Sequence, residues 1–92
     1  MNTLIISYDL KRQNTNYEQL YETIKEANGW WHYLDSFWII VSEKNASQWA
    51  DILKSKIDND DSLIIIEVQK GSTNGWLPQR AWDWINKNTS IE

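Results

Sequence analysis

Four short apolar runs of strand length and two longer stretches of helical period follow one another along this chain in a restrictive order. The apolar runs are rich in β-branched and aromatic residues and cover residues 4–8, 30–34, 37–41 and 63–68. The helical stretches repeat apolar side chains every three or four positions over residues 17–27 and 45–57. The order is therefore strand, helix, strand, strand, helix, strand, which few folds accommodate in a short chain.

This order predicts an α+β fold, the ferredoxin-like βαββαβ sandwich, in which a four-stranded antiparallel sheet carries two helices on one face. The chain has 92 residues, the length of a single domain. We place the core of this domain at residues 3–69. Residues 70–92 form a Trp-rich C-terminal extension, in which residues 79–87 have a short helical pattern with Trp82 and Ile85 on one face.

Local signals mark the ends of both expected helices. Asn45 and Gln48 have the spacing of a capping box at the start of the second helix. Asn28 and Gly29 follow the first helix, where a glycine can adopt the left-handed conformation that ends a helix. The acidic segment Asp-Asn-Asp-Asp at 58–61 ends the second helix. It lacks the Gly and Glu positions of an EF-hand calcium loop, so we interpret it as a solvated loop.

The expected sheet has one face without helices. Residues 63–68 are apolar at nearly every position, which predicts burial on both faces or cover from the C-terminal extension. A second copy of the chain is the simplest cover for a bare apolar face. We therefore expect a homodimer.

Composition narrows the classes of function. Thirteen acidic and nine basic residues give a net charge of −4, which argues against a protein that coats duplex DNA. The absence of cysteine excludes disulfides, iron–sulfur clusters and thiolate zinc sites. No apolar run approaches the roughly 20 residues that span a bilayer, and the first residues lack a secretory signal pattern, so we expect a cytoplasmic protein with no membrane partner. Seven tryptophans are difficult to bury in a small core, so some should line a cleft or an interface.

Three segments carry a resemblance to a known group of small proteins. They are Ile-Ile-Ser-Tyr-Asp-Leu at 5–10, Asp-Ser-Phe-Trp-Ile-Ile at 35–40, and residues 57–68. Together they resemble the small subunit of the CRISPR spacer-adaptation complex and its relatives, the VapD-type toxin ribonucleases and the SinR-family proteins of bacteria and phages. Trp-Trp-His-Tyr-Leu-Asp-Ser at 30–36 and Gly-Trp-Leu-Pro at 75–78 are similar to the SinR family in particular.

The resemblance implies a ferredoxin-like homodimer with Asp9 of each copy near the two-fold axis. In the nuclease members of the group, this paired Asp is proposed to hold a divalent metal, so the resemblance assigns Asp9 as a candidate catalytic residue and a candidate ligand of Mg²⁺ or Mn²⁺. Two carboxylates brought together do need a hard cation between them, and such a cation can activate water. The chain departs from this pattern in its few basic residues and its single Asp per copy.

The candidate residues also have ordinary structural explanations. An Asp directly after a strand, such as Asp9, is a common turn initiator. Tyr8 can contact a base or a phosphate, but the end of a strand also places it in the core. His32 has no Cys or second His beside it for a metal site and no identified partner for general-base catalysis, which favours a hydrogen-bonded role in the hairpin.

The aromatic hairpin at residues 30–38 leaves two explanations open. Alternation along the strand places Trp30 and His32 on one face and Trp31 and Tyr33 on the other. At least one large ring should therefore lie outside the helix-packed core. Stacking on a base and closure of a dimer interface both account for such a ring.

These observations favour a homodimeric binding module without catalytic activity, which binds a nucleotide-like ligand or a partner protein at the dimer interface. The expected ligand-binding residues are Tyr8, Lys11, Arg12, Trp30, His32, Ser36 and Arg80. One alternative is a Mg²⁺- or Mn²⁺-dependent nuclease of RNA or DNA that uses Asp9 from both copies. Another is an inhibitor or antitoxin-like protein whose acidic surface meets a basic partner.

Overall fold

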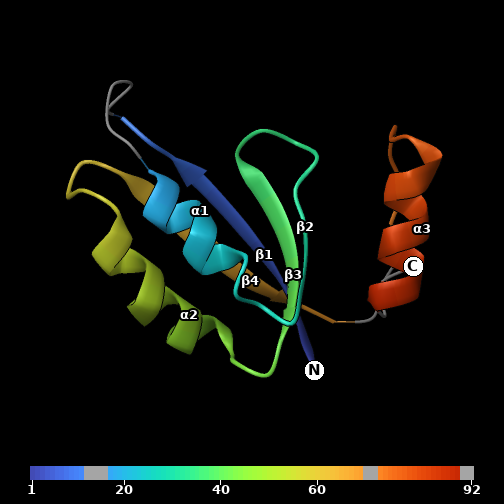
Figure 1. Cartoon of the computed structure of the whole chain (residues 1–92), viewed down its shortest axis with the longest axis horizontal. Helices are drawn as coiled ribbons and strands as arrows, with labels where there is room; N and C mark the ends of the chain where they lie inside the picture. Colours follow the sequence, from blue (N-terminus) through green and yellow to red (C-terminus); the bar gives the residue numbers. More distant parts are fainter. Residues whose placement is uncertain (12–16, 70–72, 90–92) are drawn as a thin grey trace.

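The computed structural model describes residues 1–11, 17–69 and 73–89. Eight elements follow one another in the predicted order, with a third α-helix in the C-terminal extension (Figure 1). They are β1 (Asn2–Asp9), α1 (Glu18–Ile24), β2 (Gly29–Trp31), β3 (Phe37–Ser42), α2 (Ala46–Leu53), the 3₁₀ turn η1 (Lys54–Lys56), β4 (Ser62–Val68) and α3 (Gln79–Asn88).

The four strands form one sheet in the order β2-β3-β1-β4, and all neighbouring strands are antiparallel. β1 lies between β3 and β4, so that Ile5 pairs with Ile39 on one side and with Ile66 on the other. The predicted α+β class and the four-stranded antiparallel sheet are confirmed. The arrangement is compatible with a ferredoxin-like sandwich.

The two faces of the sheet are covered by different helices. On one face, Leu4 and Ile6 of β1 pack in a core with Leu20 of α1 and Leu53 of α2, and all four are fully buried. On the other face, a smaller cluster joins the sheet to α3 through Trp31, Ile39, Ala81 and Ile85. Figure 1 shows α1 and α2 side by side and α3 apart from them. The extension therefore covers part of the face that the sequence left bare.

Cover on this second face decreases across the sheet toward β4. In one row of paired residues, Ile39 of β3 is 5% exposed, Ile5 of β1 is half-buried and Ile66 of β4 is 48% exposed. Ile64, two residues earlier on β4, is 57% exposed. The expectation that β4 is buried on both faces or covered by the C-terminal extension is therefore wrong for Ile64 and Ile66, because α3 packs against the β2 side of the sheet. We call Ile64 and Ile66 the open strip.

Two details of the predicted boundaries are resolved by side-chain contacts. The capping box is confirmed, since Asn45 and Gln48 each bond the backbone N–H of the other. β2 ends at Trp31 instead of residue 34, because His32 turns to stack on Trp38, with its Nε2 2.8 Å from the carbonyl oxygen of Asp35. Among the described residues, no helix combines the length and the apolar character required to cross a bilayer.

Candidate functional site

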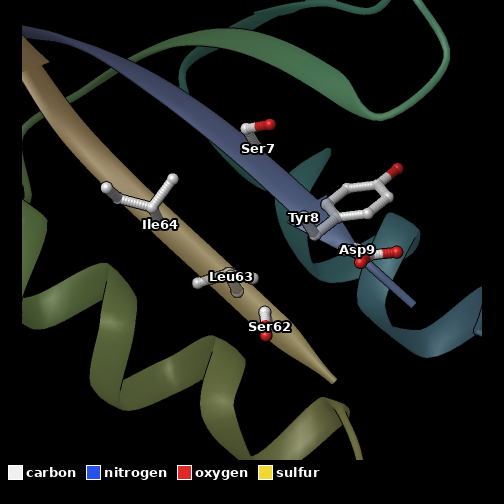
Figure 2. A pocket seen from close by; sticks show the side chains of 6 residues that line it. All are labelled: Ser7, Tyr8, Asp9, Ser62, Leu63 and Ile64. Carbon is white, nitrogen blue, oxygen red and sulfur yellow. The ribbon is translucent and has the colours of Figure 1, made fainter. Parts of the chain in front are cut away.

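A groove lies at the end of β1 beside the open strip (Figure 2). Its volume is about 270 Å³, and its lining residues are Ser7, Tyr8, Asp9, Ser62, Leu63 and Ile64. Strand pairing sets Asp9 opposite Ser62 and Ser7 opposite Ile64. Because Ile64 belongs to both the groove and the open strip, a partner on the strip would also close one side of the groove.

Asp9 lies at the surface of this groove and is paired with a cation. Its Oδ2 accepts a hydrogen bond from Lys11 Nζ at 2.6 Å, and both side chains are more than half exposed. This bond raises the pKa of Lys11. Within the described part of the chain, no group of three or more His, Cys, Asp or Glu side chains could hold a metal. One carboxylate already paired with an ammonium does not fit a divalent cation, so a role for Asp9 with Mg²⁺ or Mn²⁺ stays a prediction that requires a second copy.

Tyr8 points to the face of the sheet that α1 and α2 cover. Its hydroxyl oxygen accepts a hydrogen bond from Nε1 of Trp38 at 3.0 Å, and its ring is 6.2 Å from that of Tyr21. Burial disfavours the phenolate and raises the pKa of Tyr8 to about 12. Tyr8 is therefore a neutral member of a packed aromatic cluster.

This shift predicts a loss of stability in alkaline solution. Below the ordinary pKa of 10.0, Tyr8 keeps its proton in both the folded and unfolded chain, and its contribution is complete. Between that value and about 12, the unfolded chain loses the proton first, so the free energy of unfolding should fall as pH rises. Urea melts across this range should show a shallower decline for Tyr8→Phe than for wild type. The exposed Tyr33→Phe is the matched control, and an equal change in both variants would contradict the prediction.

Several of the expected ligand residues gather around one buried tryptophan. Trp38 is 1% exposed, and the His32 ring stacks on it at 3.7 Å between centroids with an 11° angle. Trp30 lies 5.5 Å from the same ring and is 40% exposed, with Lys25 Nζ 5.2 Å from its centroid. Ser36 contacts this group through its backbone carbonyl oxygen, which accepts a hydrogen bond from the backbone N–H of Tyr8 at 3.3 Å. The predicted alternation of the hairpin is confirmed, because Trp31 instead stacks with Tyr33.

Two of the expected residues, His32 and Arg80, meet at a second cleft between the end of β2 and α3. This cleft has a volume of about 280 Å³ and is lined by Trp31, His32, Tyr33, Arg80, Ala81 and Trp84. The guanidinium carbon of Arg80 lies 5.8 Å from the centroid of the Tyr33 ring. Lys11 does not line this cleft and instead pairs with Asp9. Arg12 lies outside the described residues. The expected ligand residues that the structure describes therefore divide between three places: the surroundings of Trp38, the cleft at Arg80 and the ion pair of Lys11 with Asp9.

Asp61 is a structural residue that sequence reasoning missed. Its carboxylate accepts hydrogen bonds from the backbone N–H of Lys11 at 2.8 Å, the hydroxyl of Tyr17 at 2.9 Å and the backbone N–H of Asp58 at 2.8 Å. These bonds connect the loop before β4 to the segments on either side of residues 12–16. The interpretation of residues 58–61 as a solvated loop holds for the exposed Asp60 and is wrong for Asp61.

Comparison with family models, with curated proteins and with solved structures finds no match for this chain. The relationship to SinR-family and CRISPR-associated proteins therefore stays a prediction.

Proposed function

We propose that the protein is a small homodimeric binding module with a ferredoxin-like core, which takes a nucleotide-like ligand and has no catalytic activity. The observation that carries this proposal is the open strip. Ile64 and Ile66 expose about half of their surface on a part of the sheet that, among the described residues, neither α1 and α2 nor α3 covers. The βαββαβ order, with β1 between β3 and β4, supports the ferredoxin-like core.

A second copy can pair along β4, beside the open strip, because β4 is an edge strand. Within the described sheet, β4 pairs only with β1, so its outer edge is available to another strand. Two β4 strands that pair antiparallel about Ile65 would set Ile64 of one copy opposite Ile66 of the other. In this register Glu67 lies opposite Leu63, so like charges do not meet. The strand is thus self-complementary, as a two-fold interface requires.

The surroundings of Asp9 support binding instead of catalysis. Asp9 is exposed and its charge is neutralised by Lys11 at 2.6 Å, whereas a catalytic carboxylate in a nuclease must be available to a metal. Incubation of the wild-type protein and Asp9→Ala with RNA and DNA in Mg²⁺ or Mn²⁺ checks this part of the proposal. We expect equal background in both, and metal-dependent cleavage that is lost only in Asp9→Ala would overturn it.

Replacing Ile64 by lysine should separate the two copies. The wild-type protein should sediment as a dimer at micromolar concentration, and I64K should weaken self-association by at least about tenfold, because a charged side chain resists burial at an interface. The matched control is L34K, which places the same charge on another exposed apolar residue, 46% exposed, away from β4. A monomeric wild-type protein, or equal dissociation of both variants, would overturn the dimer.

A further inference from the structure

We propose that the cleft between β2 and α3 binds a nucleoside phosphate, with the base against the aromatic side chains and the phosphate on Arg80. This inference rests on one part of the proposed function, namely that the protein binds a nucleotide-like ligand. It does not depend on the pairing of two copies, because the cleft lies on the β2 side of the sheet and the open strip lies on β4.

The shape of the cleft comes from two distant parts of the chain. Residues 31–33 supply one wall and residues 80–84 the other, so the cleft exists only because α3 folds back on the sheet. Trp31 is 7% exposed and Ala81 is 2% exposed, which makes them a rigid floor, whereas Tyr33 is 48% exposed. The volume of about 280 Å³ is small for a ligand pocket and suits a single nucleotide better than a longer strand.

The aromatic side chains offer a surface for a flat ring. Trp31 and Tyr33 are 6.0 Å apart between centroids in a stacked arrangement, with an angle of 30° between their planes. Trp84 lines the same cleft from α3 and is half-buried. Bases stack on such rings with little dependence on sequence, because every base has an aromatic face.

The charge of the cleft favours a phosphate. Arg80 makes no ion pair with any described residue, and its guanidinium rests against the Tyr33 ring with its N–H groups available. A guanidinium binds phosphate through two parallel hydrogen bonds. None of the six lining residues is acidic, whereas the groove at Asp9 presents a carboxylate that would repel a phosphate.

The ring of His32 turns away from Trp31 and Tyr33, so Arg80 is the polar side chain that the cleft offers to a ligand. The Nε2 of His32 is held 2.8 Å from the carbonyl oxygen of Asp35, and its ring is fixed by the stack on Trp38. Arg80 alone supplies enough positive charge in the cleft to bind one phosphate group. In a protein of net charge −4, it supplies too little to bind a long nucleic-acid backbone.

Calorimetric titration with AMP, GMP, CMP and UMP tests the inference. We expect at least one of them to bind the wild-type protein, adenosine or the matching nucleoside to bind at least about tenfold more weakly, and R80A to lose at least about tenfold in affinity. The matched control is K87A, which removes the same charge from an exposed position of α3 outside the cleft. Y33A is a second variant on an exposed ring, and it should also weaken binding while the fold is retained.

The outcomes separate the inference from the proposed function. If a nucleotide binds and neither R80A nor Y33A weakens it relative to K87A, the assignment to this cleft is overturned and nucleotide binding by the module remains. If no nucleotide binds, both the assignment and the ligand in the proposed function are overturned, and the dimer is judged separately by sedimentation. Binding of a single-stranded RNA tetramer without binding of any mononucleotide would also overturn the inference, because the cleft would then be part of a longer nucleic-acid surface.

Discussion

Replacing Asp61 by alanine is expected to lower the free energy of unfolding by about 3 kcal/mol. The carboxylate accepts hydrogen bonds from two backbone amides and from the hydroxyl of Tyr17, whose side chain is only 8% exposed. Hydrogen bonds to a charged group contribute about 1.5–3 kcal/mol each, and the donors left behind in a partly buried loop lose their partner. The three bonds share one acceptor group, so their losses will not simply add.

Urea denaturation of Asp61→Ala and Asp60→Ala measures this effect with the overall charge change held constant. Asp60 is the exposed neighbour, so its replacement should change the free energy of unfolding by less than about 0.5 kcal/mol. Asp61→Asn keeps one oxygen acceptor and should lie between the two alanine variants. Equal stability of Asp60→Ala and Asp61→Ala would show that the network does not hold the loop.

The sequence predicts the order of the elements well because each element has its own local signal. The strand at residues 37–41 and the capping box at Asn45 are confirmed in the structure, and both depend on neighbours within a few positions. The burial of β4 could not be predicted in this way. The exposure of Ile64 and Ile66 depends on which half of the sheet α3 covers, and this is decided by contacts of Ala81 and Ile85 with β2 and β3.

In the candidate site, too, local sequence patterns do not show which distant segments meet. Sequence patterns placed Tyr8 and Arg80 in one ligand site. The structure turns Tyr8 toward Trp38 on one face and sets Arg80 on the far side of β2 with Tyr33. Asp61 was missed because two of its hydrogen-bond donors, Tyr17 and Lys11, lie 44 and 50 positions earlier in the chain, a separation that no local motif reports.

Replacing Gly29 by alanine should destabilise the fold by about 1–3 kcal/mol, although a glycine-to-alanine change in a strand is usually favourable. Gly29 was expected to adopt a left-handed helix cap. Instead it begins β2, and none of the described glycines has a positive φ. The reason for glycine here is space, since a Cβ at this position would lie 2.7 Å from Cγ2 of Val41 and 3.7 Å from Cζ2 of Trp84. The first distance is a clash, and overpacking of this kind costs about 1–3 kcal/mol.

Two comparisons identify the clash as the cause. Gly75→Ala makes the same chemical change where the new Cβ would meet only ring carbons of Trp82 at 3.8 and 3.9 Å, so it should leave stability within about 0.5 kcal/mol of wild type. Val41→Ala removes the methyl group that Gly29→Ala would strike, because the two residues are paired across β2 and β3. The double variant should therefore lose less stability than the sum of the two single variants. Strict additivity would mean that Gly29 is required for some reason other than its approach to Val41.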